Sequence, residues 1–117
     1  MHYFNKLEVW KKARSFTKQI YTITKDFPSF ERFGLSSQMQ RAVISISSNI
    51  AEGAGRNSKN EYIHFLNIST GSAFELETQI NLAKDLEYIS EEKETELISE
   101  IHSIQKMLFR LIQSINK

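Results

Sequence analysis

The sequence predicts an all-α protein with an antiparallel up-down-up-down four-helix bundle. Three observations predict this fold. Four segments carry apolar residues at helical spacing, short stretches containing Gly, Pro, Asn or Ser separate them, and no segment shows the two-residue alternation of a strand. The chain has 117 residues, a length that suits one domain with one core, so residues 1–117 are expected to form a single four-helix-bundle domain.

The first helix is expected over about residues 6–26. Its apolar residues cover an arc of about 160°, which is wider than the ~100° stripe that one buried face requires. Phe27 and Pro28 end the helix because proline disfavours the α region for the residue before it. The arc of the first helix consists of Val9, Trp10, Ala13, Phe16, Thr17, Ile20, Tyr21 and Ile23.

The second helix is expected over residues 35–54.

The third and fourth helices each begin at a serine N-cap. Ser58 and Glu61 have the spacing of a capping box, in which the serine hydroxyl accepts from the Glu61 N–H and the carboxylate reaches back to the Ser58 N–H. Apolar and small residues then repeat every 3.5 residues on average over residues 62–83. Ser90 precedes three glutamates, and an apolar stripe follows over residues 97–115.

Composition indicates a cytoplasmic protein that does not span a membrane. No segment approaches the ~18 uninterrupted apolar residues of a membrane span, and residues 1–16 lack the apolar region of a signal peptide. The chain has no cysteine, which excludes disulfides and thiolate chemistry. Its net charge of +1 conceals an asymmetry: residues 1–60 carry ten Lys/Arg against four Asp/Glu, whereas residues 61–117 carry five against ten.

Two glycines, Gly53 and Gly55, raise the question of a phosphate-binding loop. A dinucleotide-binding loop needs a third glycine and a preceding strand, and a P-loop needs a Gly-Lys-Ser/Thr ending; neither is found here. A helix–helix joint explains the segment better, with one glycine in the left-handed conformation that ends many helices and with an ion pair between Glu52 and Arg56. The predicted joint comprises Asn49, Glu52, Gly53, Gly55, Arg56, Ser58 and Glu61.

An anion is the alternative for this joint. The free N–H groups at the start of the third helix, together with Arg56 and Lys59, would receive it.

A set of residues between positions 4 and 89 carries a family resemblance, and its most specific run is S-N-I-A-E-G-x-G-R, from Ser48 to Arg56. The matching residues are Phe4, Leu7-Glu8-Val9-Trp10, Phe27-Pro28, Glu31, Gly34-Leu35, Gln38, Arg41-Ala42, Ser45-Ile46, Ser48-Asn49-Ile50-Ala51-Glu52-Gly53, Gly55-Arg56, Phe65-Leu66-Asn67-Ile68, Gly71-Ser72 and Glu75-Leu76-Glu77-Thr78. With these residues the chain resembles the bacterial 23S rRNA-intervening-sequence, or S23-like, proteins, whose relatives include the accessory variability proteins of diversity-generating retroelements.

The resemblance implies a four-helix protomer that assembles into a ring-like homopentamer without an established enzymatic activity. Some members are encoded within intervening sequences of rRNA genes. The retroelement relatives bind nucleic acid and a reverse transcriptase through basic surfaces, so the partners that the resemblance implies are RNA or DNA and such a protein. One departure from the family pattern is Ser47, where the family usually has proline, and a weaker helix kink is expected there.

Basic residues are the most useful functional hint. Lys11, Arg14 and Lys18 share one face of the first helix, where they form either a solubilising surface or, repeated around a ring, a cationic surface that attracts phosphates. The candidate nucleic-acid-binding residues are Lys11, Arg14, Lys18, Lys25, Arg41, Arg56 and Lys59.

The wide apolar arc of the first helix suggests an interface between copies, because it exceeds what one bundle buries. Trp10 and the phenylalanines at positions 4, 16, 27, 30 and 33 are expected to be core or interface anchors, with base stacking as the alternative. The candidate interface residues are Val9, Trp10, Phe16, Ser45 and Ser48.

Two other readings remain open. Glu61 and His64 spell half of a ferritin-like metal site, but the second E-x-x-H that such a site needs is missing. We therefore predict no metal, no cofactor and no catalytic residue, and keep a metal-binding or enzymatic bundle as the alternative function. A regulatory role of the toxin–antitoxin kind, with another protein as partner, is a third possibility.

Overall fold

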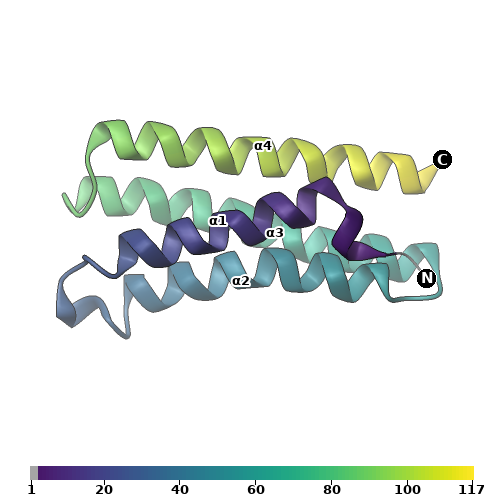
Figure 1. Cartoon of the computed structure of the whole chain (residues 1–117), viewed down its shortest axis with the longest axis horizontal. Helices are drawn as coiled ribbons and strands as arrows, with labels where there is room; N and C mark the ends of the chain where they lie inside the picture. Colours follow the sequence, from purple (N-terminus) through teal and green to yellow (C-terminus); the bar gives the residue numbers. More distant parts are fainter. Residues whose placement is uncertain (1–2) are drawn as a thin grey trace.

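In the computed structural model, which describes residues 3–117, the chain folds into a rod with extents of 44 × 24 × 20 Å (Figure 1). Four long helices make up the rod: α1 (Glu8–Thr24), α2 (Leu35–Ala54), α3 (Lys59–Asp85) and α4 (Glu91–Asn116). Two short 3₁₀ turns, η1 (Phe4–Lys6) and η2 (Ser29–Glu31), precede α1 and α2. No strand occurs among residues 3–117, so the predicted all-α fold is confirmed.

The helices follow an up-down-up-down path. The α1–α2 and α3–α4 connections lie at one end of the rod, and the α2–α3 connection lies at the other end, together with η1 and the C-terminus (Figure 1). Each helix packs against its neighbours in sequence, and α1 also contacts α4. No helix among residues 3–117 combines the length and apolar content that a membrane-spanning segment needs.

The core forms along the seams that the periodicity predicts. All seven predicted seam positions of α3, from Tyr62 to Ala83, are buried. On α4 the first four stripe residues are buried, and Leu111 and Ile115 near the C-terminus are half-buried. The largest fully buried side chains are Phe16, Ile20, Met39, Ile46, Ile50, Leu66, Leu76, Ile80, Leu97, Ile101, Ile104 and Leu108.

Small residues bring α2 and α3 close together. The Ser69 hydroxyl donates to the Ile46 carbonyl at 2.8 Å, and the Ser72 hydroxyl donates to Ser45 Oγ at the same distance. A larger side chain at Ser69 would separate the two backbones, because that position is fully buried. The α2 helix is continuous through Ser47.

The first helix is shorter than predicted, Glu8–Thr24 instead of residues 6–26. Leu7 is extended before it, with ψ 127°. After Thr24 the chain tightens, since the N–H groups of Asp26 and Phe27 donate to carbonyls three residues back. Phe27 itself turns into the core, 7% exposed, and so fixes where the chain leaves α1.

The α3–α4 connection contains the left-handed residue that helix ends often use. Glu87 has φ 64°, and it is the one non-glycine residue among 3–117 with positive φ. The Tyr88 N–H donates to the Ala83 carbonyl at 2.8 Å and the Glu87 N–H donates to the Lys84 carbonyl at 2.9 Å, which is the Schellman pattern. A side chain at this position is strained, because L-residues disfavour the left-handed region.

Replacing Glu87 with glycine is therefore expected to stabilise the protein, by about 0.5–1 kcal/mol, because glycine adopts this conformation without a Cβ penalty. Thermal unfolding followed by circular dichroism would show the gain as a rise in Tm of about 2–4 °C for a domain of this size. The matched control is Asp85→Gly, which lies within α3 and is expected to lower Tm. An unchanged or lower Tm for Glu87→Gly would contradict the prediction.

Candidate nucleic-acid interface

The basic stripe of α1 lies in solvent, as predicted, but its members differ in their partners. Lys11 Nζ is 3.4 Å from Glu8 Oε1. The pair is exposed, so it contributes little to the stability of the fold. The guanidinium of Arg14 lies 5.5 Å from the centroid of the Trp10 ring. Lys18 forms no ion pair with any residue between 3 and 117. The full charge of Lys18 is thus available to an anion.

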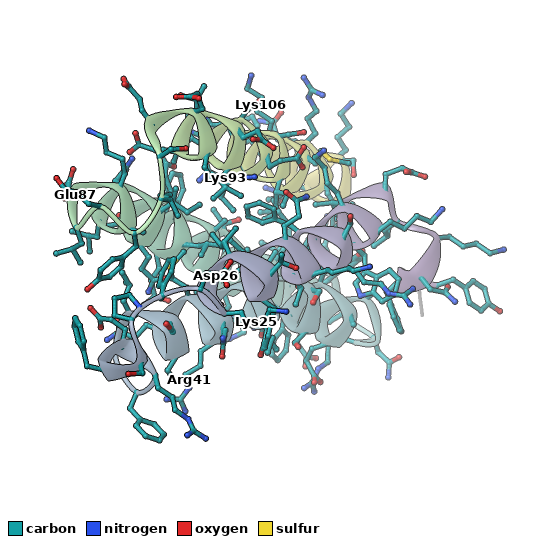
Figure 2. All side chains as sticks on the ribbon, turned by 60° about the vertical axis from the view of Figure 1, so that its left-hand side comes forward. Lys25, Asp26, Arg41, Glu87, Lys93 and Lys106 are labelled. Carbon is teal, nitrogen blue, oxygen red and sulfur yellow. The ribbon has the colours of Figure 1, made fainter. Side chains whose placement is uncertain are left out.

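Three other predicted cations, Lys25, Arg41 and Lys59, are exposed and have no carboxylate partner within residues 3–117. Lys25 follows α1 and Arg41 is on α2. Figure 2 shows both on the α1–α2 part of the molecule, whereas Glu87 lies on the α3–α4 part. Both signs occur on each part, since Figure 2 also shows Asp26 beside Lys25 and shows Lys93 and Lys106 on α4, so the difference between the two parts is one of net charge.

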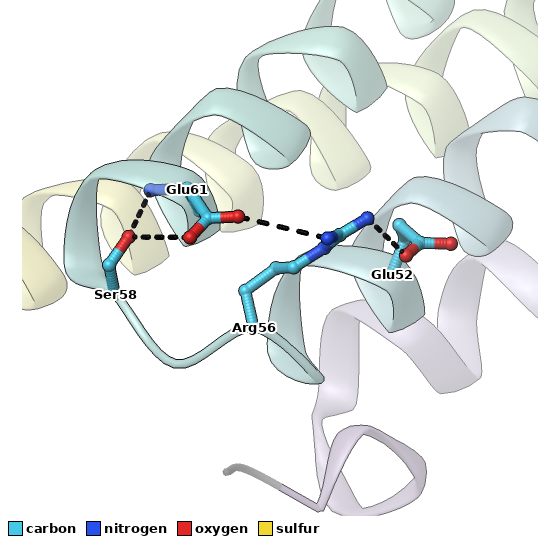
Figure 3. Close-up of polar contacts among 4 residues, drawn as sticks. All are labelled: Glu52, Arg56, Ser58 and Glu61. Carbon is cyan, nitrogen blue, oxygen red and sulfur yellow. Dashed lines mark hydrogen bonds and ion pairs between the residues drawn. The ribbon is translucent and has the colours of Figure 1, made fainter.

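Arg56 does not belong with the free cations. Its Nη2 lies 2.7 Å from Glu52 Oε2, its Nη1 lies 3.7 Å from Glu61 Oε2, and the guanidinium stacks 4.7 Å from the centroid of the Phe65 ring (Figure 3). The predicted Glu52–Arg56 pair is confirmed. Two carboxylates at this cation argue against the anion site considered for the start of α3.

Of the two hydrogen bonds predicted for the capping box at Ser58, one is confirmed. The Glu61 N–H donates to Ser58 Oγ at 3.1 Å, which confirms the N-cap. The Glu61 carboxylate instead accepts from the Ser58 hydroxyl at 3.2 Å and faces Arg56 (Figure 3). Asn49, another predicted joint residue, donates to Ser45 one turn back in α2. The joint thus contains a cluster of Glu52, Arg56, Ser58 and Glu61 at the α2–α3 connection, whereas Asn49 is bonded within α2.

The expectation of a left-handed glycine in this joint is wrong. None of the chain's four glycines has positive φ, and Gly55 ends α2 with φ −83° and ψ −5°. Gly53 is needed for a different reason: a Cβ there would lie 3.0 Å from both Phe65 Cβ and the Tyr62 carbonyl oxygen. Close approach of α2 to α3, and not backbone conformation, explains this glycine.

Two of the five predicted interface residues are core residues. Val9 is 4% exposed and Phe16 is 0% exposed within the single bundle, so neither is available to a second copy. The wide apolar arc of α1 is partly buried inside the chain, since α1 contacts both α2 and α4, but Tyr21 on this arc is exposed. Trp10 is half-buried against the core and meets the Phe4 ring edge-on at 5.1 Å. Ser45 is half-buried, and Ser48 is exposed.

Glu61 and His64 are not brought together with other metal ligands. Glu61 contacts Ser58 and Arg56, and the His64 ring lies against Phe65, 5.2 Å between centroids. No group of three or more His, Cys, Asp or Glu side chains that could hold a metal ion occurs within residues 3–117. His2, another of the chain's histidines, lies outside the described residues.

The α1–α2 turn carries two of the aromatic residues that the sequence analysis expects to be core or interface anchors. Phe30 is 77% exposed and Phe33 is 87% exposed, so neither is a core residue, whereas an interface role and base stacking both stay predictions. The guanidinium of Arg32 lies 5.2 Å from the Phe33 ring centroid. A sequence signal existed: the two phenylalanines flank an arginine in a segment without helical periodicity.

A hollow of about 380 Å³ opens beside this turn. Two cations, Lys25 and Arg32, line it together with the polar side chains of Ser29, Ser36 and Gln40. None of the residues that line it, all within the described part of the chain, is acidic. The hollow therefore has the charge and the donor groups that suit an anion.

Glu31 fixes the turn in place. Its Oε1 accepts from the Leu35 N–H at 3.0 Å, which caps α2, and its Oε2 accepts from the Tyr88 hydroxyl at 2.7 Å, which ties the turn to the α3–α4 connection. Both hydrogen bonds hold the pKa of the Glu31 carboxyl below its usual range, and the bond from the Leu35 N–H has the larger effect. The hydrogen bond between Tyr88 and Glu31 raises the pKa of the Tyr88 hydroxyl. Gly34 leaves room for this carboxylate, since a Cβ there would lie 2.5 Å from Oε1.

Replacing Glu31 with glutamine is expected to lower Tm at pH 7 by a few degrees at most. The pKa of Glu31 is lower in the folded state than in the unfolded state, so its carboxylate stabilises the fold above the unfolded-state pKa, and this contribution is lost as the pH falls through the folded-state pKa. Melting curves between pH 7 and pH 3 should show the difference from wild type shrinking at the acid end. Glu75→Gln, at an exposed carboxylate with no partner in residues 3–117, is the control. An equal loss at both ends of the pH range would contradict the prediction.

Comparisons with known proteins agree with this architecture. The family model of 23S rRNA-intervening sequence proteins matches residues 5–110. A crystal structure of a protein of unknown function from the S23 ribosomal protein family of Bacteroides thetaiotaomicron superimposes with a TM-score of 0.83 at 29% sequence identity, covering 90% of this chain and 95% of that one. No curated protein matches the sequence. The signature, the helical fold and the match over most of the chain lead to one conclusion: this protein belongs to the 23S rRNA-intervening sequence protein family.

Proposed function

We propose that this protein is a non-catalytic interaction protein that self-associates and binds nucleic acid in the cytoplasm through the α1–α2 side of its bundle. The observation that carries the proposal is the set of cations on this side that lack carboxylate partners in residues 3–117, namely Lys18, Lys25 and Arg41. Phosphates would neutralise these charges and release counterions, which favours binding at low salt.

The charge distribution supports a polyanion more than a protein of mixed charge. Residues 1–60, which include α1 and α2, hold ten Lys/Arg and four Asp/Glu. Three of those four acids are engaged locally, Glu8 with Lys11, Glu31 with Leu35 and Tyr88, and Glu52 with Arg56. The excess of Lys/Arg over Asp/Glu in residues 1–60 gives this side a positive potential. The name of the family, which refers to intervening sequences of 23S rRNA, makes RNA the first nucleic acid to test.

Self-association is supported by the number of large apolar side chains exposed on α2, α3 and α4, since burial of such side chains between copies is favourable. A homopentamer is the state that the family resemblance implies. Sedimentation of the full chain at micromolar concentration tests the proposal: a single species of protomer mass would contradict it. The exposed large apolar residues on these helices are Ile44, Ile68, Phe74, Leu82 and Phe109.

The binding proposal is tested by titrating fluorescent RNA and DNA oligonucleotides with the protein at low and moderate salt. We expect the logarithm of the binding constant to fall linearly with the logarithm of the salt concentration. The double variant Lys18→Glu/Arg41→Glu should bind at least about 10-fold more weakly, because two attractive charges become repulsive. Lys106→Glu/Arg110→Glu makes the same charge change on α4 and is the matched control.

Two outcomes would overturn the binding proposal. One is the absence of binding to either nucleic acid at the lowest salt tested. The other is an equal loss in the α1–α2 variant and the α4 control, which would show that net charge, and not the α1–α2 side, determines affinity.

A further inference from the structure

We infer that the α1–α2 turn is the docking site for a single-stranded nucleic acid, with the rings of Phe30 and Phe33 stacking on bases and the adjacent hollow holding a backbone phosphate. This inference rests on the proposed nucleic-acid binding and adds to it a place on the molecule and a preference for single strands.

The two rings lie mostly in solvent and are not part of the core. Phe30 and Phe33 are 77% and 87% exposed, whereas Phe27, in the same segment, is 7% exposed and packs at 5.1 Å from the Tyr88 ring. Exposed aromatic rings beside cations form stacking platforms for unpaired bases, because every base has a π-face. Arg32 supplies such a cation at the Phe33 ring.

The hollow next to the rings is suited to one phosphate group. Lys25 and Arg32 line it, and neither forms an ion pair with any residue between 3 and 117. The carboxyl end of α1 also borders the hollow, at Thr24, and disfavours an anion there. The two full positive charges outweigh this partial negative charge.

Ser36 adds a hydroxyl to the lining of the hollow. The residue as a whole is 6% exposed, and its hydroxyl has no hydrogen-bond partner among residues 3–117. The hydroxyl oxygen is not one of the buried polar atoms without a partner, so it is open to the hollow and free to donate to a ligand there. Ser36 also lies in the first turn of the 20-residue helix α2, where the helix dipole favours negative charge and the Glu31 carboxylate already caps the Leu35 N–H. A phosphate oxygen would accept from this hydroxyl.

The anchoring of the turn favours a preformed site. Glu31 lies between the two rings in sequence, but its carboxylate is bonded to the Leu35 N–H and the Tyr88 hydroxyl. The turn is thereby connected to both α2 and the α3–α4 connection. Binding would cost less ordering free energy than on a loose loop. A duplex would not use the rings, because its bases are already stacked on one another.

Fluorescence anisotropy on the full chain tests the inference with a fluorescein-labelled uridine oligonucleotide, the matching thymidine oligonucleotide and a duplex of equal length. We expect wild type to prefer the single strands. Phe30→Ala/Phe33→Ala should weaken single-strand binding at least about 10-fold and duplex binding little, since stacking is lost. The matched control, Phe74→Ala/Phe109→Ala, removes two rings of 56% and 61% exposure from α3 and α4 and should leave affinity unchanged.

The phosphate contact is tested separately with Lys25→Ala/Ser36→Ala, which should weaken single-strand and duplex binding alike. Inorganic phosphate distinguishes the source of the anion. We expect it to compete only weakly with the oligonucleotides and to shift the backbone amide resonance of Ser36 in ¹H–¹⁵N spectra. If inorganic phosphate shifts Ser36 while the ring variant binds oligonucleotides as wild type does, the site is one for free phosphate and the inference is overturned.

Other outcomes separate this inference from the proposed function. If wild type binds no oligonucleotide, the proposed function fails and this inference fails with it. If wild type binds and both turn variants bind as tightly as wild type does, the inference is wrong while the proposed function stands. If Phe30→Ala/Phe33→Ala changes the sedimenting mass and leaves affinity unchanged, the turn is a contact between copies and the inference is again overturned.

Discussion

Replacing Phe16 with alanine is expected to lower the free energy of unfolding by about 3–5 kcal/mol, the usual cost of removing a buried phenylalanine side chain. Phe16 is 0% exposed and lies in the central core on α1. Removal of the ring leaves a cavity that the packed helices fill only in part. For 117 residues this corresponds to a fall in Tm of about 12–20 °C. Urea titration and thermal melts followed by circular dichroism would measure both quantities.

This prediction also separates a core position from an interface position. A core residue of the single chain should show the same lost unfolding free energy per chain at every protein concentration, whereas an interface residue should show a loss that depends on concentration. Tyr21→Ala, at an exposed position on the same helix, is the control and should cost less than about 1 kcal/mol. If Phe16→Ala instead gave a smaller assembly with unchanged stability per chain, Phe16 would be an interface residue and the prediction would be wrong.

The sequence predicts the fold well because a four-helix bundle is encoded locally. Apolar spacing fixes which side of each helix is buried, so the α3 seam from Tyr62 to Ala83 and the α2 range Leu35–Ala54 are confirmed. Helix ends depend on weaker signals. The predicted first helix extends too far at both ends because nothing in its spacing shows that Leu7 is extended or that Phe27 turns into the core.

Sequence predicts the members of the candidate surface but not their partners. It places Lys11, Lys18 and Arg56 together as cations, and the structure shows Lys18 free of carboxylates within residues 3–117, Lys11 paired and Arg56 held by two glutamates. These differences arise from contacts between side chains, which periodicity does not contain. The α1–α2 turn has the same limit: its composition marks the segment, but which of Phe27, Phe30 and Phe33 packs inward depends on tertiary contacts.

The arc of α1 shows that an observation about one helix does not settle which of its residues an interface could use. Its width does exceed one buried stripe, but a helix in a bundle packs against two neighbours, and α1 contacts both α2 and α4. Val9 and Phe16 therefore offer no surface for self-association, whereas Tyr21 on the same arc is exposed. Exposed apolar residues such as Ile44, Phe74 and Phe109 offer such surface without Val9 or Phe16.

Gly53→Ala is expected to destabilise the protein by about 2 kcal/mol. Overpacking costs roughly 1–3 kcal/mol, and the better helix propensity of alanine returns at most ~1 kcal/mol. The steric cost should lie at the upper end, because the new Cβ would lie 3.0 Å from the Tyr62 carbonyl oxygen, a backbone atom that moves only if α3 moves. A fall in Tm of about 8 °C is expected in thermal melts.

Gly55→Ala is the matched control, two residues further along the same helix end. Its Cβ would have no neighbour closer than 3.6 Å, and its φ of −83° is open to alanine, so stability should stay the same or rise by up to about 1 kcal/mol. If both glycines were required for a left-handed turn, both substitutions would destabilise. A loss confined to Gly53 would establish that the S-N-I-A-E-G-x-G-R run contains this glycine because two helices touch there. Equal losses at the two positions would contradict that explanation and favour a backbone role for the pair.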